Sequence, residues 1–408
     1  MTERTQVVVV GAGPVGLSAA VRLARLGIAC ICLEKRETLG TASKASTFHA
    51  PTLEIFREFG IVDRMLAMGL RADRIQYRMS DGEVAAQFDH ALLAGDTDYP
   101  FRLHLEQSQI TPLLADALAA SGLGSLRLNC EVTEVDPGTE SDAGSAVVTY
   151  RDGAGVEHRI RADFVLGADG AHSRVREALG LGLDGVEYPG RVMRLIVRDP
   201  LEQALPDLGQ ITYVFNPAGG SISLLQMPEI WRVIVRLGEG FDPEQVVRPE
   251  WYMPVVAPFL PGIPSALDVV GTDIYGARKM LATDYGRGRA YLIGDALHLT
   301  NTRGGMNMNC GIHDAYAVGG AIAQALLRNE VPLATAAARA RHLMARDELL
   351  PRTDGNIRAG LDRVAQMRAT AADPVAARSM LLRSSMLDMA PARDGSARLS
   401  PIVERNPA

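Results

Sequence analysis

Hydrophobic residues near the N-terminus follow the pattern of a strand, a turn, a helix and a second strand. The apolar run 7–10 leads into the glycine-rich segment 11–16, and residues 17–26 then repeat apolar positions at helical spacing. Gly27 ends this helical pattern, and a second apolar run occupies 28–33. An apolar run followed by a glycine turn and a helix is typical of a βαβ unit. We therefore predict a parallel sheet and an α/β fold.

The remainder of the chain alternates between helical and strand-like spacing. In chain order we expect two short helices within 42–70, a sheet-like stretch at 74–98, a helix at 105–121, two meander strands at 125–137 and 145–153, a strand at 158–167, antiparallel strands within 182–276, a strand and glycine turn at 290–298, a helix at 311–329 and further helices after Val331. An antiparallel sheet with one apolar face is suited to covering a pocket.

These alternations predict a cofactor domain that is discontinuous in sequence. The expected division assigns 1–75, 100–181 and 277–330 to the cofactor domain, 76–99 and 182–276 to a substrate domain with a mixed or antiparallel sheet, and 331–408 to a C-terminal helical region. The 408 residues are enough for two packed domains, because single cores usually stop growing before about 300 residues.

Composition and charge narrow the range of partners. Hydrophobic residues make up 47% and charged residues 22%, which suits a globular protein with a large core. A net charge of −6 without a basic run argues against nucleic acid. The sequence has no stretch of about 18 apolar residues that would span a membrane, and the apolar run 7–10 is too short for an export signal. We expect no membrane association and a cytoplasmic location.

The cysteines and histidines show no metal-binding pattern. The four cysteines form no C-x-x-C pair and have no histidine at metal spacing. This predicts neither a disulfide framework nor a zinc site, and it fits a reducing cytoplasm. His298 and His313 lack acidic partners at ligand spacing, so we expect structural roles for both and no metal.

The first candidate binding motif is the hexapeptide GAGPVG. Gly11 permits a tight turn, Gly13 lets the backbone approach a pyrophosphate, and Gly16 lets the helix pack on the strand. With Pro14 and Val15 between them, these glycines start a helix whose positive N-terminus faces the phosphates.

Glu34 ends the second strand about 20 residues beyond the glycines, where an acidic residue accepts hydrogen bonds from ribose hydroxyls. We therefore assign Glu34 and its neighbour Lys35 to a dinucleotide site, with a solvated carboxylate at a strand end as the alternative for Glu34. NAD and FAD both satisfy these features, so this unit does not choose between them.

Two further segments decide between the nucleotides: GADGAHSRVR at 167–176 and RAYLIGDALH at 289–298. With GAGPVG they resemble the three fingerprints of the group A flavin-dependent aromatic hydroxylases, the para-hydroxybenzoate hydroxylase-like family. The resemblance spans residues 6 to about 325. It implies a Rossmann-like, glutathione reductase-like domain that binds one FAD non-covalently.

The resemblance also implies a monooxygenase reaction. NADH or NADPH reduces FAD, O2 adds at flavin C4a, and the C4a-hydroperoxyflavin transfers hydroxyl to a small aromatic substrate, phenolic or N-heteroaromatic. The cofactor carries the hard step, so the protein must hold the substrate and exclude water. A homodimer is a candidate assembly. The alternatives are an FAD-dependent reductase or oxidase on the same fold, and a non-catalytic flavin-binding protein.

Individual cofactor contacts follow from the same resemblance. Asp295, which follows Gly294, takes the position of the family's acceptor for the FAD ribityl chain. Asp169 takes the position that braces the pyrophosphate region, with Ser173 and Arg176 ordering the turn. An ordinary turn is the alternative for Asp169, because Asp-Gly is a common turn pair.

Three more positions correspond less closely. Gln107 matches a glutamine near the flavin and pyrophosphate, and Val132 matches a residue that offers its backbone to the adenine. A surface glutamine and a plain strand residue are the respective alternatives. Lys44 takes the place of a family arginine beside the flavin, and it supplies charge without the planar donor fork.

The loop after Asp295 resembles the family's G-Q-G-M-N segment. Gly305, Met308 and Asn309 match it, whereas Asn307 replaces a glycine. The resemblance implies that backbone N–H groups of this loop approach the flavin ring, and that the following helix stabilises negative charge there.

The candidates for a base that activates a phenolic substrate are Tyr213, His49 and His104. Tyr213 lies in an alternating stretch that presents one apolar face. Arg303, in the flavin loop, is a candidate contact for a substrate carboxylate, with a solvated loop arginine as the alternative.

Overall fold

The first sheet holds the predicted N-terminal βαβ unit. The computed structural model describes residues 2–41, 45–139, 144–238, 240–263, 266–357 and 361–391. The strands of this sheet are β1 (Glu3–Val10), β2 (Cys30–Leu33), β8 (Gly124–Arg127), β9 (Glu131–Asp136), β10 (Ala146–Arg151), β11 (Glu157–Gly167), β19 (Gly286–Arg287) and β20 (Ala290–Leu292). β8, β2, β1, β11 and β20 pair in parallel, with Val9 opposite both Cys32 and Leu166. The apolar run of β1 is buried on both faces, as a central parallel strand requires.

The predicted strand at 125–137 is in fact two strands with different partners. β8 pairs in parallel with β2, whereas β9 pairs antiparallel with β10. Between them, Asn129 adopts a left-handed conformation with φ of 56°, which asparagine tolerates better than most residues. The predicted meander is therefore formed by β9, β10 and β11.

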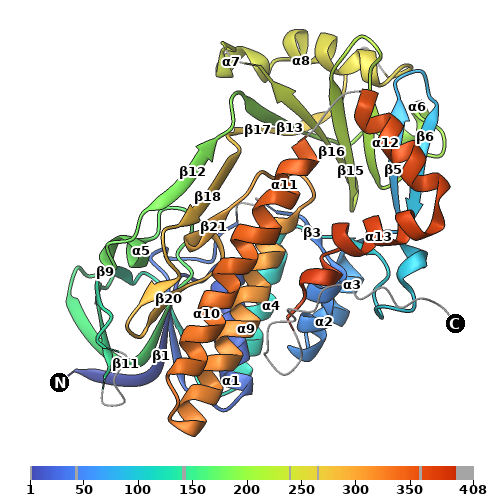
Figure 1. The fold of residues 1–408 in the computed structure, drawn as a ribbon. Helices are drawn as coiled ribbons and strands as arrows, with labels where there is room; N and C mark the ends of the chain where they lie inside the picture. The colour runs from blue at the N-terminus through green and yellow to red at the C-terminus, as the bar shows by residue number, and fades with distance from the viewer. Residues whose placement is uncertain are drawn as a thin grey trace, which may run out of the picture.

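Four long helices pack beside the first sheet. They are α1 (Pro14–Arg25), α4 (Gln107–Ala120), α9 (Met306–Arg328) and α10 (Pro332–Met344). α1 packs against both α4 and α9, and α10 runs along the outer side of α9 (Figure 1). Gly305 and Asn329 both have left-handed backbone conformations, and they begin and end α9.

The second sheet is mixed. Figure 1 shows it in the upper right of the view, beyond the end of α11 (Leu350–Ile357). Its strands are β17 (Val269–Tyr275), β13 (Arg191–Val197), β16 (Ile230–Leu237), β15 (Ser221–Met227), β14 (Ile211–Phe215), β5 (Arg74–Met79) and β6 (Val84–Asp89), in spatial order. β14 and β5 pair in parallel and the other neighbours pair antiparallel. The sheet-like stretch predicted to reach residue 98 stops at Asp89, whose carboxylate caps a 3-10 turn, η1 (His90–Leu93).

The remaining elements connect and cover the two sheets. Two small sheets contain β3 (Thr47–Phe48), β4 (Leu70–Ala72) and β7 (Arg102–His104), and β12 (Leu183–Glu187), β18 (Arg278–Ala282) and β21 (His298–Leu299). The other helices are α2 (Ala50–Glu58), α3 (Val62–Met68), α5 (Arg174–Ala178), α6 (Leu201–Ala204), α7 (Pro243–Val246), α8 (Pro249–Val256), α11 (Leu350–Ile357), α12 (Leu361–Ala372) and α13 (Pro374–Ser384).

The C-terminal helices contribute to the core of the second sheet. Val364 of α12 and Leu381 of α13 share a buried cluster with Ile75 of β5 and Phe88 of β6. Figure 1 shows α12, in red, beside β5 and β6. Among the described residues, none of the helices combines the length and the apolar character that crossing a bilayer demands.

Candidate active site

Three glycine turns meet at the carboxyl ends of the parallel strands. A Cβ at Gly11, after β1, would lie 2.6 Å from the carbonyl oxygen of Ala168, in the turn after β11. A Cβ at Gly16 would lie 1.9 Å from the carbonyl oxygen of Gly11. At Gly294, after β20, a Cβ would lie 3.0 Å from the side chain of Val15. Only glycine permits the first two approaches, so these turns pack as one unit.

Gly13 is the open position of this unit. A Cβ there would meet no heavy atom within 4 Å, unlike at Gly11 and Gly16. Gly13 is also the N-cap of α1, with no side chain accepting the first N–H groups, and Pro14 is the first helical residue. An uncapped helix N-terminus beside open backbone is suited to binding phosphate oxygens.

Glu34 is fixed at the edge of this turn. It is 6% exposed, and its Oε2 accepts a hydrogen bond from the Ala12 N–H at 2.9 Å. The carboxylate is therefore anchored to the glycine turn, which disfavours the alternative of a solvated strand end; Lys35 beside it is exposed. The Glu34 carbonyl accepts from the Cys130 N–H at 2.8 Å, so the start of β9, and Val132 with it, lies close by. A role of Val132 toward adenine stays a prediction.

Asp169 braces the turn after β11, and Arg176 joins that turn to the third one. Its Oδ1 accepts from the Ser173 hydroxyl at 2.5 Å and its Oδ2 from the Val175 N–H at 3.1 Å. Arg176 donates to the carbonyl of Ala296 at 3.0 Å. The aspartate therefore acts on its own turn, and any contact with a pyrophosphate stays a prediction.

A chain of polar contacts links the third turn to α9 and α10. Asn307 Nδ2 donates to Asp295 Oδ1 at 2.7 Å, and Asn307 Oδ1 lies 3.0 Å from His298 Nδ1. His298 Nε2 lies 2.8 Å from Asp314 Oδ2, and Arg341 Nε donates to Asp314 Oδ1 at 2.6 Å. His298 and Asp314 are fully buried.

The prediction that His298 lacks an acidic partner is wrong. Burial alone would lower the pKa of His298, but the Asp314 carboxylate raises it well above its usual value. Asp314 lies 16 residues beyond His298 in sequence, and the start of α9 brings it back to the turn. His298, Asp314 and Cys310 could together hold a metal ion. However, Arg341 bonds to both Asp314 and the Cys310 sulfur, at 3.2 Å, so a guanidinium already neutralises this group.

The side chain of Asn309, a residue that matches the family's loop segment, holds the loop before α9 in place. Asn309 Nδ2 donates to the carbonyls of Thr47 at 2.8 Å and Gly305 at 2.7 Å, and its Oδ1 accepts from the His49 N–H at 3.0 Å. His49 Nε2 lies 3.0 Å from the carbonyl oxygen of Gly304. The loop and β3 are therefore fixed to each other.

Gln107 is similarly tied to the segment after Lys44. Its Oε1 accepts from the Ala45 N–H at 3.2 Å, and its own N–H donates to the Ala45 carbonyl at 3.0 Å. This disfavours a free surface glutamine. Lys44 itself lies outside the described residues. Met308 is buried in the core of the first domain, and its predicted backbone contact with a cofactor stays a prediction.

Two tyrosines of the second sheet lie close to two arginines, one of which, Arg303, belongs to the loop before α9. The rings of Tyr213 and Tyr77 have centroids 5.1 Å apart. The Arg303 guanidinium lies 5.1 Å from the centre of the Tyr213 ring. Arg102, on β7, is 4% exposed and interacts electrostatically with both tyrosines. The predicted base candidate Tyr213 therefore lies in a positively charged environment.

The other two base candidates are buried, neutral histidines. Burial lowers the pKa of His104 to about 4, and burial together with Arg102 holds the pKa of His49 well below its usual value. His104 Nδ1 lies 2.6 Å from the carbonyl of Gln226, and a carbonyl only accepts, so Nδ1 carries the proton. By the same argument His49 carries its proton on Nε2, opposite Gly304. His104 Nε2 and His49 Nδ1 are left as bare, buried nitrogens without a partner among the described residues.

Comparison with known proteins decides the family. The family model described as "FAD binding domain" matches residues 4–348. Para-nitrophenol 4-monooxygenase of Pseudomonas sp. (strain WBC-3) is 30% identical over 76% of this chain and 75% of that protein. The crystal structure of p-nitrophenol 4-monooxygenase PnpA from Pseudomonas putida DLL-E4 superimposes with a TM-score of 0.84 at 25% identity, covering 98% of this chain and 100% of that one. The chain belongs to the FAD-dependent aromatic hydroxylases.

A further relative is a longer protein, of which this chain matches a smaller share. Pentachlorophenol 4-monooxygenase of Sphingobium chlorophenolicum is 28% identical over 78% of this chain and 58% of that protein. The resemblance found from the three glycine motifs and the prediction of FAD as cofactor are therefore confirmed, as is the α/β fold class. The residues of the three turns fit FAD, because Gly13 leaves open backbone at the N-terminus of α1 while the flanking turns pack tightly.

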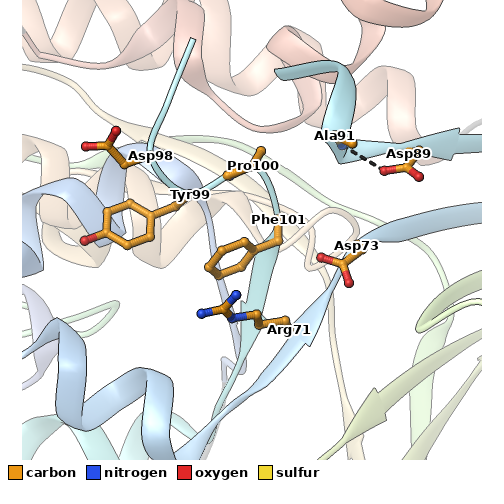
Figure 2. A pocket seen from close by; sticks show the side chains of 8 residues that line it. All are labelled: Arg71, Asp73, Asp89, Ala91, Asp98, Tyr99, Pro100 and Phe101. Carbon is orange, nitrogen blue, oxygen red and sulfur yellow. Dashed lines mark hydrogen bonds between the residues drawn. The ribbon is translucent and has the colours of Figure 1, made fainter. Parts of the chain in front are cut away.

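A surface pocket of the hydroxylase lies away from this site. It has a volume of about 440 Å³ and is lined by Arg71, Asp73, Asp89, Ala91, Asp98, Tyr99, Pro100 and Phe101. Figure 2 shows Arg71 beside the Phe101 ring and three carboxylates around the rim. None of the predicted site residues lines it, so this pocket is not part of the candidate site. Sequence reasoning missed Arg102, which interacts with Tyr213 and Tyr77, because no motif surrounds it.

Proposed function

We propose that this hydroxylase adds one oxygen atom from O2 to a small phenolic or N-heteroaromatic ring, with NADH or NADPH as the reductant. Relatives named for para-nitrophenol, pentachlorophenol and 6-hydroxy-3-succinoylpyridine support this substrate class. A cytoplasmic location and a homodimeric assembly complete the proposal.

The observation that carries the proposal is the position of the loop at 301–305. On one side it continues into α9, beside the packed glycine turns. On the other side Arg303 reaches the Ser221 hydroxyl at 3.4 Å and the Tyr213 ring, both on the second sheet. A ring cofactor held on this loop would therefore face an aromatic-lined space.

The cofactor side has groups for several parts of FAD. The N-terminus of α1 at Gly13 would hold the pyrophosphate, Glu34 the ribose and Asp295 the ribityl chain. Bound FAD supplies the redox chemistry and the activation of oxygen. The backbone of Gly305 and Asn307 at the start of α9 would stabilise negative charge on the flavin ring.

The substrate side supplies orientation and proton acceptors. His104 Nε2 and His49 Nδ1 are neutral acceptors that can take a hydrogen bond from a phenolic hydroxyl. Tyr213 offers its ring for stacking and its hydroxyl for proton relay, next to Arg303. The buried surroundings exclude water from the reacting atoms.

The test is product formation. Purified, FAD-loaded protein is mixed with NADH or NADPH in air and a panel of phenols, aromatic acids and hydroxypyridines, and products are identified by mass spectrometry. We expect a subset of the panel to stimulate NAD(P)H oxidation and to gain one oxygen atom. Stimulated oxidation with hydrogen peroxide and no oxygenated product would indicate an oxidase. No stimulation across the panel would favour a non-catalytic flavin-binding protein.

A further inference from the structure

The loop at 301–305 has little internal structure to hold it in place. Gly304 and Gly305 have positive φ values, of 96° and 63°, and glycine loses more conformational freedom on ordering than any other residue. Among the described residues, a single backbone–backbone hydrogen bond lies within this loop, from the Gly305 N–H to the Thr302 carbonyl at 3.3 Å. Contacts from outside the loop must therefore fix its conformation.

Asparagine side chains tie this loop to α11. Asn301 is 2% exposed, and its Nδ2 donates to the Thr353 carbonyl of α11 at 2.7 Å. Its Oδ1 accepts from the Arg303 N–H at 3.1 Å. From the helix side, Asn356 Nδ2 donates to the Arg303 carbonyl at 3.3 Å, and the Arg303 guanidinium donates to the Asn356 carbonyl at 3.2 Å. Loop and helix thus exchange hydrogen bonds in both directions.

The fit between Asn356 and the glycines of the loop is close. A Cβ at Gly304 would lie 2.9 Å from Asn356 Nδ2. His49 and Asn309 bond to the carbonyls of Gly304 and Gly305, so the same glycines are also held by side chains of the cofactor domain. The amide of Asn356 therefore completes the enclosure of the backbone from the α11 side.

α11 is itself fixed to neighbouring elements. It continues α10, where Arg341 Nε donates to Asp314 Oδ1 of α9 at 2.6 Å. At the other end, Lys279 of β18 donates to Asp354 of α11 at 2.5 Å, and the Tyr188 hydroxyl donates to the same carboxylate. Groups carried on a helix that is fixed at both ends are positioned more precisely than groups on a loop.

A π-helical turn between α10 and α11 sets which face of α11 meets the loop. This turn is η4 (Ala345–Leu349), and the backbone is helical on both sides of it. A π turn contains one residue more than an α turn, which rotates all later residues by about 100° around the helix axis. Thr353 and Asn356 are three residues apart and share one face of α11. Without η4 this face would be turned away from the loop.

We propose that Asn301 and Asn356 are positioning residues, which fasten the loop at 301–305 to α11 and so fix the place where the ring cofactor meets the substrate. The inference rests on the proposed function, because the loop lies between the glycine turns and the second sheet. A displacement of about 1 Å between reacting groups can cost about a hundredfold in rate. With the loop released, O2 takes two electrons from reduced FAD, with two protons, and leaves as hydrogen peroxide instead of oxygenating the ring.

The first experiment measures the loop without turnover. Hydrogen exchange of the backbone amides at 300–306 is followed by mass spectrometry, in the protein with and without FAD. We expect Asn301→Ala and Asn356→Ala to speed exchange of this segment about fivefold or more, the effect of losing one typical hydrogen bond. Asn216→Ala is the matched control, since Asn216 donates to the Pro258 carbonyl at 3.1 Å after β14, and it should leave the segment unchanged. Unchanged exchange in both loop variants would overturn the inference.

The second experiment compares two replacements of Asn356. Asn356→Leu is close to asparagine in size but has no donor, whereas Asn356→Gln keeps an amide donor on a longer side chain. Iodide quenching of the fluorescence of bound flavin measures how exposed the ring is. We expect Asn356→Leu to raise this quenching about twofold or more and Asn356→Gln to recover part of the change. Equal quenching in both variants and the parent would contradict a positioning role.

Turnover then separates the inference from the proposed function. With a ring that the hydroxylase oxygenates, Asn301→Ala and Asn356→Ala should at least about double the hydrogen peroxide formed per NAD(P)H consumed, and Asn216→Ala should not. Faster loop exchange and greater flavin exposure, without oxygenated product from any ring, would retain the clamp and end the hydroxylase proposal. Oxygenated product formed with parental coupling in both loop variants would retain the hydroxylase and overturn the inference.

Discussion

Beside the third glycine turn, Asp314 lies between His298 and Arg341, and their charges offset one another inside the folded chain. On the substrate side, Arg102 and Arg303 lie among tyrosines and neutral histidines, without a carboxylate among the described residues. The charges beside the third glycine turn are thus balanced before any ligand binds, whereas the substrate side keeps buried nitrogens without a partner among the described residues. This difference indicates that the cofactor binds to a preformed site, whereas the substrate supplies partners for polar groups that the chain leaves unpaired.

The largest effect is expected from breaking the completed side. Asp314→Asn leaves Arg341 as a buried cation facing a neutral amide and removes the carboxylate that holds the proton on His298, which should cost about 3–5 kcal/mol of unfolding free energy. Urea denaturation measures this loss. Asp116→Asn removes a carboxylate from an exposed ion pair with Arg64 and should cost less than about 1 kcal/mol. Similar costs for both variants would show that the buried network is not a stabilising unit.

The next effect concerns pH on the substrate side. The pKa of His104 is lowered to about 4 by burial, whereas an unfolded histidine titrates near about 6.5. Between these values the unfolded chain binds a proton that the folded chain does not, so stability falls as pH falls. The loss should be about 2 kcal/mol between about pH 7.5 and pH 5.

His104→Gln should remove this part of the pH dependence, because glutamine does not titrate. An unchanged slope in His104→Gln would mean that His104 is charged in the folded protein.

The next prediction concerns the contribution of Asp295 to FAD binding. Asp295→Ala should weaken FAD binding by about 1.5–3 kcal/mol, the range for hydrogen bonds to charged groups. Fluorescence of released flavin measures the affinity, and thermal unfolding of the FAD-free protein measures stability. Asp295 has a partner within the chain, Asn307, so Asn307→Ala is the matched control and should affect FAD affinity less. Unchanged FAD affinity in Asp295→Ala would show that the residue is misplaced.

The smallest effect compares two buried arginines directly. Arg232→Met leaves the partly buried Glu106 carboxylate without its cation, whereas Arg102→Met leaves no carboxylate behind. We expect Arg232→Met to lose about 1–2 kcal/mol more stability than Arg102→Met in urea denaturation. A larger loss for Arg102→Met would indicate that its charge is balanced within the chain.

The sequence was sufficient where the signal is local. A strand, a glycine turn and a helix lie next to each other in sequence, so GAGPVG and the two later glycine segments predicted the cofactor cradle and the family. Glu34 was singled out by its distance from the first glycines and Asn309 by its match to the family's loop segment, and both side chains anchor a turn or loop.

Long-range pairing could not be read in this way. Asp314 faces His298 only because the start of α9 folds back on the turn, and Arg341 arrives from α10. Arg102 lies on the three-residue strand β7, which carries no motif. It interacts electrostatically with Tyr213, which lies more than 100 residues further along the chain. The sheet-like stretch ended early at Asp89 because a capping carboxylate competes with strand pairing, which periodicity alone does not reveal.

A crystal structure of the FAD-loaded protein with 4-nitrophenol tests the central contrast most directly. The account predicts FAD along the three glycine turns with the His298 and Asp314 pair unchanged, and the ligand ring between the loop at 301–305 and Tyr213 of the second sheet. A ligand bound elsewhere, such as in the acidic pocket of Figure 2, would contradict it.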